Sequence, residues 1–227
     1  MTDYAFPPAK PVSLPILGQT ERFPVRRIYC VGKNYLDHVS EMGGDVEAAK
    51  SGRSEPVFFT KAAETLVESG VDIPYPPNTE NLHHEVELVV AMGPSDDGDV
   101  EIFAYGVGID MTRRDLQASA KTKGGPWDRA KNFSHSAPCS ELTLAKDVDL
   151  TKAHIVLRKN GDIVQQAALS DMIWNIDEII AHLKSDMDLK AGDLIYTGTP
   201  SGVGPVTRGD ELSGGAEGLE RITVRFF

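Results

Sequence analysis

HHEVELVVAM, residues 83–92, is the stretch of sequence that most constrains the fold. Polar and apolar residues alternate from His83 to Val90, which is the pattern of a β-strand with one face in the core. Side chains two residues apart on a strand point to the same side. Glu85 and Glu87 therefore share one face, and the valine and leucine residues between and after them point into the core.

Two neighbouring carboxylates on one strand face repel each other and are costly to bury without a positive partner. A divalent cation neutralises them directly, and carboxylate oxygens are the ligands that Mg²⁺ and Mn²⁺ prefer. The pattern by itself also fits a half-exposed strand with a solvated acidic face. Both interpretations of Glu85 and Glu87 stay open at this point.

Most other segments with regular patterning also predict strands, and few predict helices. The Asn160-Gly161 pair is the preferred two-residue turn of a β-hairpin. We expect a helix that starts with a capping pair, Thr112 and Asp115, and ends at Gly124. The expected strands are 27–31, 56–60, 102–109, 154–159, 162–167, 193–197 and 222–226, and the expected helices are 34–42, 112–123 and 170–185. The sequence therefore predicts one β-dominated α+β domain.

Asp110 follows the predicted strand 102–109 and precedes the predicted helix 112–123. An aspartate at this position is either a metal ligand at the mouth of the sheet or an ordinary helix cap. The helix places Arg114, Gln117 and Lys121 close to one face. That face is either a solvated surface or a polar wall that faces a ligand.

His38 and Glu41 are three residues apart on the predicted helix 34–42, so their side chains can meet. A carboxylate beside a histidine fixes its tautomer and raises its basicity, as a general base requires. A surface His–Glu pair explains the same spacing. Thr199 lies in a loop rich in glycine and hydroxyl groups, residues 196–205, which either binds a carboxylate or is a structural turn.

Composition restricts the class of protein. The chain has 227 residues with 23 Lys and Arg against 34 Asp and Glu, a net charge of −11, which disfavours nucleic-acid binding. No run of ~20 apolar residues predicts a membrane span, and residues 1–10 lack the apolar core of a secretory signal. With only Cys30 and Cys139, we expect a cytoplasmic protein. We expect a proline-rich extended segment over residues 1–24 and a single folded domain over 25–227.

Six ordered motifs together resemble the fumarylacetoacetate hydrolase family, over about residues 27–227. They are CVGKNY (30–35), His38–Glu41, His83–Val90, IDMTRRDLQ (109–117), KGGPW with KNF (123–133), and Gly192-Asp193 through Pro205. With the proline-rich opening and RFPVRRI (22–28), the sequence is most similar to the bacterial fumarylpyruvate hydrolase, or acylpyruvate hydrolase, branch.

The resemblance implies a rolled mixed β-sheet, a homodimer, and a role for each of nine residues. It also implies that residues 25–227 are a single catalytic domain, with a possible mobile lid at 34–55. Glu85, Glu87 and Asp110 become ligands of Mg²⁺, with Mn²⁺ as the other possible ion. The remaining assignments are His38 and Glu41 as the dyad that activates water, Lys131 as the partner of an oxyanion, and Arg114, Gln117 and Thr199 as substrate contacts.

The reaction that the resemblance implies is hydrolysis of a C–C bond in a 3-acylpyruvate, most closely 3-fumarylpyruvate, as in aromatic catabolism through gentisate. Fumarylpyruvate has a second carboxylate, and Lys61, Arg113 and Arg129 are open candidates for its cation. Three alternatives remain: oxaloacetate decarboxylation, keto–enol isomerisation of a 2-oxo diacid at the same metal site, and a non-catalytic module that binds dicarboxylates.

Overall fold

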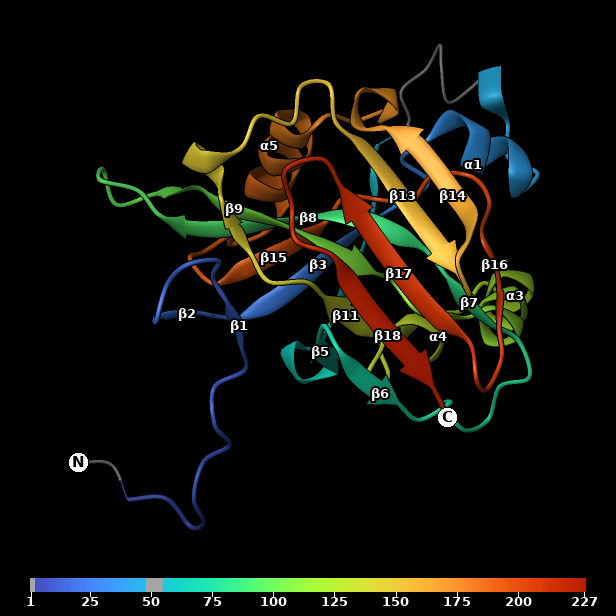
Figure 1. Ribbon diagram of the computed structural model, residues 1–227, viewed down its shortest axis with the longest axis horizontal. Helices are drawn as coiled ribbons and strands as arrows, with labels where there is room; N and C mark the ends of the chain where they lie inside the picture. The colour runs from blue at the N-terminus through green and yellow to red at the C-terminus, as the bar shows by residue number, and fades with distance from the viewer. Residues whose placement is uncertain (1–2, 48–54) are drawn as a thin grey trace.

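A computed structural model describes residues 3–47 and 55–227. The largest sheet has eight strands, and its central strands β8 and β9 carry the segment that dominates the sequence pattern (Figure 1). Its strand order is β4 (Val57–Lys61), β3 (Arg27–Gly32), β15 (Asp193–Tyr196), β8 (Val86–Pro94), β9 (Val100–Ile109), β11 (Ala137–Cys139) and β5 (Leu66–Glu68), and β12 (Thr143–Leu144) pairs with β9. Parallel and antiparallel pairs occur together, so the sheet is mixed, as expected.

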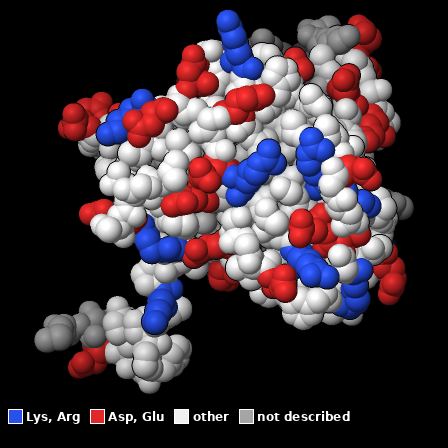
Figure 2. Space-filling model, viewed as in Figure 1, with Lys and Arg blue, Asp and Glu red and all other residues white. Residues whose placement is uncertain are grey.

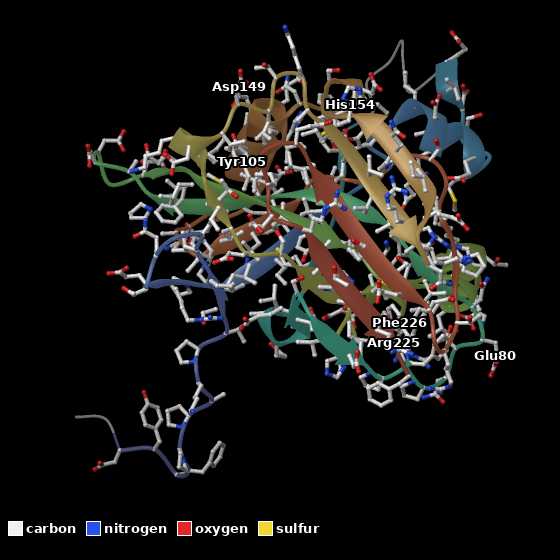
Figure 3. All side chains as sticks on the ribbon, viewed as in Figure 1. Glu80, Tyr105, Asp149, His154, Arg225 and Phe226 are labelled. Carbon is white, nitrogen blue, oxygen red and sulfur yellow. The ribbon has the colours of Figure 1, made fainter. Side chains whose placement is uncertain are left out.

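Smaller sheets surround this one. The five-stranded sheet has the order β14 (Asp162–Ala168), β13 (His154–Lys159), β17 (Glu211–Ala216), β18 (Ile222–Phe226) and β6 (Val71–Ile73). The three-stranded sheet consists of β10 (Thr112–Arg113), β7 (Leu82–His84) and β16 (Gly204–Val206), and the two-stranded sheet of β1 (Ser13–Pro15) and β2 (Arg22–Pro24). Phe226 is buried and Arg225 is exposed, the alternation expected of a strand with one face in the core (Figure 3).

The helices found in residues 3–47 and 55–227 are short, and strands predominate, which confirms the predicted fold class. The α-helices are α1 (Leu36–Glu41), α3 (Arg114–Lys123), α4 (Asp128–Lys131) and α5 (Ile176–Asp186). The 3-10 helices are Ala63–Thr65, Ala145–Asp147 and Leu169–Asp171. None of the helices in the part of the chain that the structure describes is long and apolar enough to span a membrane.

Strand β8 is buried on both faces because three apolar clusters meet on it. Leu88 packs with the five-stranded sheet, Val89 with the layer under β1 and β2, and Val90 with α5. A strand covered in this way has no solvated side, so the alternative of a solvated acidic face at Glu87 is wrong.

Several element boundaries differ from the sequence prediction, and three of these differences are informative. The strand predicted over 83–92 breaks at Glu85 into β7 and β8, which belong to different sheets. The helix predicted from Thr112 begins at Arg114, because Thr112 pairs with His83 in a sheet, and Asp115 accepts a hydrogen bond from Thr79. The predicted capping pair is therefore wrong.

The helix predicted over 170–185 begins at Ile176. Asn175 and Glu178 form a capping box there, so the preceding residues are excluded from the helix. The predicted hairpin turn is confirmed: Asn160 and Gly161 both have positive φ, 54° and 94°, between β13 and β14.

The N-terminal segment divides into two parts. Residues 4–10 are exposed and extend away from the body of the molecule (Figure 1), whereas Leu14, Ile16 and Phe23 of the β1–β2 region are buried in the core. Part of the predicted lid over 34–55, residues 48–54, lies outside the described residues. On the face seen in Figure 2, basic and acidic side chains are interspersed.

Candidate active site

Three carboxylates come together where β8 and β9 meet. Glu85 precedes β8, Glu87 lies on it, and Asp110 follows β9; the antiparallel register pairs Val86 with Ile109 and so brings the three side by side. The Asp110 backbone N–H donates to the Glu85 carbonyl over 2.8 Å. All three side chains are buried, and each offers an oxygen within 4.8 Å of the others.

Three cationic groups face these carboxylates. Lys131 Nζ at the end of α4 lies 2.6 Å from Glu85 Oε2 and 2.5 Å from Asp110 Oδ2. Lys61 Nζ on β4 lies 2.9 Å from Asp110 Oδ1, and the Arg114 guanidinium pairs with Glu85 Oε1. Buried charges require partners of this kind, because their desolvation would otherwise be prohibitive.

The two glutamates differ in their electrostatic environment. Burial raises the pKa of Glu85, but the positive charges of Lys131 and Arg114 outweigh burial and hold that pKa well below its usual range. Burial, together with the negative charges of Asp110 and Glu85, raises the pKa of Glu87 well above its usual range. Glu87 therefore favours the neutral acid unless a further positive charge is supplied.

The donor set fits a divalent cation. Asp110 Oδ1 is buried and has no hydrogen-bond partner among the described residues, although it lies within ion-pair distance of Lys61. Within residues 3–47 and 55–227, no basic side chain forms an ion pair with Glu87. The hydrogen bond found for its carboxylate there is the one that Oε2 accepts from the Gly198 N–H, over 2.8 Å. Three buried carboxylates whose oxygens lie this close together and are incompletely paired are suitable ligands for Mg²⁺ or Mn²⁺.

His38 and Glu41 lie on α1, and His38 lines the same pocket as the three carboxylates. His38 Nδ1 is 3.1 Å from Glu41 Oε2, and Glu41 Oε1 accepts the Gly202 N–H over 3.1 Å. Because the carboxylate can only accept, Nδ1 carries the proton and Nε2 is the basic nitrogen. The predicted pairing is therefore present, and His38 is buried rather than on the surface.

The buried side chain of Asn34 connects α1 to the rest of the site. Its amide nitrogen donates to the Trp174 carbonyl over 3.0 Å and to the Thr197 carbonyl over 2.8 Å. Its amide oxygen accepts the Trp174 N–H over 2.8 Å. Gly198 adjoins this contact with φ of +101°, and a Cβ there would lie 2.6 Å from the Asn34 Cβ, so the position requires glycine.

The predicted substrate contacts line the same pocket. Arg114, Gln117 and Lys121 all line it, so this side of α3 forms a polar wall, which is buried at Gln117 and exposed to solvent at Lys121. Arg114 Nη1 donates to Gln117 Oε1 over 2.5 Å. Thr199 lines the pocket as well, from the glycine-rich loop that follows β15.

Gln165 is a contributor that the sequence analysis missed. It is buried on β14, where its Oε1 accepts the Val86 N–H over 3.1 Å and lies 3.0 Å from His84 Nδ1. Its Nε2 donates to Thr199 Oγ1 over 2.8 Å and to the Pro200 carbonyl over 2.9 Å. Thr199 Oγ1 therefore accepts a hydrogen bond from Gln165, and the Thr199 O–H can donate to a group in the pocket. An inward-facing glutamine in a hairpin strand was the only sequence signal.

The three basic residues that the sequence analysis offered for a distal carboxylate of the substrate do not line this pocket. Lys61 is buried behind Asp110 and donates to the carbonyl oxygens of Met111 and Lys131. Arg113 stacks on the Phe133 ring, with its guanidinium carbon 4.2 Å from the ring centroid. Neither residue lines the pocket, and neither does the exposed Arg129.

Comparisons with known proteins show what the chain as a whole is similar to. Residues 27–226 match the family model "Fumarylacetoacetate (FAA) hydrolase C-terminal". A fumarylpyruvate hydrolase of Ralstonia sp is 44% identical over 173 residues, covering 74% of this chain and 90% of that protein. The mitochondrial oxaloacetate tautomerase of Homo sapiens is 40% identical over 207 residues, covering 88% and 91%.

A solved structure gives the same result. The crystal structure of fumarylpyruvate hydrolase from Pseudomonas aeruginosa, in complex with Mn²⁺ and pyruvate, superposes with a TM-score of 0.91. Sequence identity is 39%, and the match covers 99% of each chain. These matches confirm the predicted enzyme class, and the chain belongs to the fumarylacetoacetate hydrolase family.

Proposed function

We propose that this protein is a metal-dependent hydrolase that cleaves 3-fumarylpyruvate to fumarate and pyruvate. The observation that carries the proposal is the arrangement of the pocket: His38, which pairs with Glu41, lines the same cavity as three buried carboxylates. The relatives named fumarylpyruvate hydrolase support this substrate.

Glu85, Glu87 and Asp110 are the residues that would hold Mg²⁺ or Mn²⁺. Mn²⁺ in the Pseudomonas aeruginosa structure and the fit of the donor set support this assignment. When bound, the cation supplies Lewis-acid stabilisation of the negative charge that forms on the pyruvate half.

His38 is the general base of the proposed reaction. Its Nε2 accepts a proton from water, while Glu41 holds Nδ1–H and stabilises the resulting imidazolium. The hydroxide adds to the acyl carbonyl of the fumaryl group, and the C–C bond to the pyruvate methylene carbon then breaks. The bonding electrons leave with the pyruvate half, which takes a proton at that carbon.

Lys131 stabilises the oxyanion that forms on the acyl carbonyl, a contribution of about 3–4 kcal/mol for one well-placed donor. Its ammonium lines the pocket and lies between Glu85 and Asp110. Arg114, Gln117 and Thr199 hold the polar groups of the substrate, because all three present donors or mixed polar groups to the cavity.

The decisive test follows the loss of enol absorbance of 3-fumarylpyruvate with purified protein, with Mg²⁺, with Mn²⁺ and with chelator. Acetylpyruvate and oxaloacetate are run in parallel, and fumarate and pyruvate are quantified as products. Metal-dependent formation of both products in equal amounts supports the proposal. Absence of turnover with either metal contradicts it.

A second candidate function is supported by the relatives named oxaloacetate tautomerase. The same carboxylate site would then stabilise a 2-oxo diacid enolate, either in keto–enol isomerisation or in decarboxylation. Decarboxylation needs no water nucleophile, so it would survive loss of the His38–Glu41 pair, whereas hydrolysis would not. Oxaloacetate turnover without fumarylpyruvate cleavage would favour this alternative.

We further propose that residues 25–227 form the catalytic domain of a cytoplasmic homodimer, in which residues 34–55 act as a lid. Family membership supports the dimer, and the position of α1 over the pocket supports the lid. Light scattering of the purified protein tests the dimer: a monomeric mass at micromolar concentration contradicts it.

A further inference from the structure

Two exposed lysines, Lys33 and Lys121, line the pocket without an ion pair to any carboxylate of the described residues. Lys131 and Arg114 both form ion pairs with Glu85. Lys33 and Lys121 line the same pocket, but none of the ion pairs found within residues 3–47 and 55–227 involves either of them. Two ammonium groups are therefore free to meet an anion there.

Lys33 is held in an unusual backbone conformation. It follows β3 with φ of 61°, in the left-handed region, where a residue other than glycine costs on the order of 1 kcal/mol. The next residue is Asn34, whose three hydrogen bonds fix the chain. These hydrogen bonds hold the backbone next to Lys33, whose side chain lines the pocket.

Lys121 reaches the pocket from a different element, helix α3, whereas Lys33 follows β3. It lies on α3, on the face that carries Arg114 and Gln117, and its Nζ is 5.3 Å from the centroid of the Trp127 ring. The ring attracts the ammonium group and restricts its position. Partial burial, followed by the positive charges of Arg114 and Lys33, lowers the pKa of Lys121. The three cations therefore converge on one part of the wall.

We infer that Lys33 and Lys121 bind the distal carboxylate of the substrate, and so select dicarboxylic acylpyruvates over monocarboxylic ones. The inference rests on the proposed function, in which the carboxylate cluster takes the pyruvate half. The net charge of −11 opposes a dianionic substrate, and two local ammonium groups reverse that field where the substrate enters. Each also supplies charge-assisted hydrogen bonds to a carboxylate.

The test compares two substrates that differ at the distal end. Fumarylpyruvate carries the second carboxylate, and acetylpyruvate has a methyl group instead. Lys121→Met keeps the stem on Trp127 and removes the charge, and Lys33→Asn removes the charge with a residue that tolerates the left-handed conformation. We expect the ratio of kcat/KM for fumarylpyruvate over acetylpyruvate to fall at least about tenfold in each variant, through KM.

Lys123→Met is the matched control, because Lys123 lies on the last turn of the same helix and does not line the pocket. It should keep the wild-type ratio. An unchanged ratio in Lys121→Met and Lys33→Asn, or an equal loss with both substrates, overturns the inference.

A binding measurement separates this inference from the proposed function. With Mn²⁺ present, fumarate should protect the wild-type protein in a thermal shift assay more than crotonate, which has a methyl group for one carboxylate. Lys121→Met and Lys33→Asn should abolish that difference. If the wild-type protein cleaves neither acylpyruvate but shows this lysine-dependent protection, the proposed function fails and the dicarboxylate subsite stands. If fumarate and crotonate protect equally, the subsite is wrong.

Discussion

The carboxylate cluster and helix α1 supply two sides of one pocket, but they are held in place by different means. Glu87 lies on β8, which is buried over eight of its nine residues and pairs with β15 on one edge and β9 on the other. The backbone of the adjoining residues is fixed by these ladders. The positions of the three carboxylates are therefore a consequence of the central sheet.

Helix α1 has six residues and no side-chain hydrogen bond at its N-cap, Tyr35. A helix of this length is not stable by itself. Its position depends on the Asn34 side chain and on the bond between Glu41 and the Gly202 N–H. His38, the proposed general base, is therefore placed by a few polar contacts to loops, and substitutions on the two sides should separate metal binding from turnover.

The largest expected effect comes from removing a charge in the cluster. Asp110→Asn should abolish tight Mn²⁺ binding and lower kcat/KM by about 10⁴-fold, because the Lewis-acid contribution of several kcal/mol is lost. Titration calorimetry with Mn²⁺ measures the first effect. Asp97→Asn, at an exposed position in the β8–β9 turn, is the control. Wild-type Mn²⁺ affinity in Asp110→Asn would remove Asp110 from the ligand set.

His38→Gln should lower kcat by about 10³-fold, in the range typical of a lost general base, and leave Mn²⁺ affinity within about twofold. Its comparison is His154→Gln, at the exposed start of β13 (Figure 3), which should behave as wild type. Steady-state kinetics and calorimetry on the same preparations decide the outcome. A weaker Mn²⁺ affinity in His38→Gln would show that the two sides of the pocket are not independent.

Asn34→Ala should lower kcat by about 10-fold to 100-fold without weakening Mn²⁺ binding, because it misplaces α1 rather than the sheet. Three buried hydrogen bonds are lost, so urea unfolding should also show a loss of about 2–3 kcal/mol. If stability falls while kcat stays at the wild-type value, α1 is positioned by other contacts.

Gln165→Glu should raise KM by about tenfold, the value of one hydrogen bond, with a smaller effect on kcat. The new carboxylate still accepts the hydrogen bond from the Val86 N–H. It can no longer donate to Thr199 Oγ1, so the Thr199 hydroxyl donates to it and its proton points away from the pocket. The matched variant is Gln166→Glu, one residue further at an exposed position. An equal rise of KM in both variants would point to a general effect of charge.

The smallest effect concerns the pH dependence of stability. Burial and the positive charge of Arg114 lower the pKa of His83 from 6.5 to about 4. The unfolded chain therefore binds more protons between pH 6.5 and pH 4, and the folded state loses stability as pH falls through that window. Because His83 is half-buried, the loss should be about 1–2 kcal/mol. Urea unfolding of the metal-free protein at pH 7 and pH 4.5 should show this loss reduced in His83→Gln, and an equal loss in both proteins would contradict it.

Local sequence was sufficient to predict most strands and the kinds of side chain that line the pocket. Asn160-Gly161 fixed its hairpin because few other residue pairs adopt two successive positive φ angles. The motifs also predicted the family, which the comparisons confirm. Helix starts were predicted poorly: Thr112 has good capping chemistry, but its pairing with His83 in a sheet prevails.

The sequence by itself determined the β-dominated fold, the family, and the kinds of group that the site contains, because periodicity and motif chemistry depend on near neighbours along the chain. Only the tertiary structure decided which groups meet. Gln165 on β14 reaches Thr199 in the loop after β15, Lys61 is buried behind Asp110, and Lys33 and Lys121 line the same pocket. The residues that meet are far apart in the sequence, so no local pattern predicts these contacts. Burial decided the rest: β8 is enclosed on both faces, so Glu87 on it and Glu85 before it form a buried carboxylate cluster with Asp110 and not a solvated acidic face.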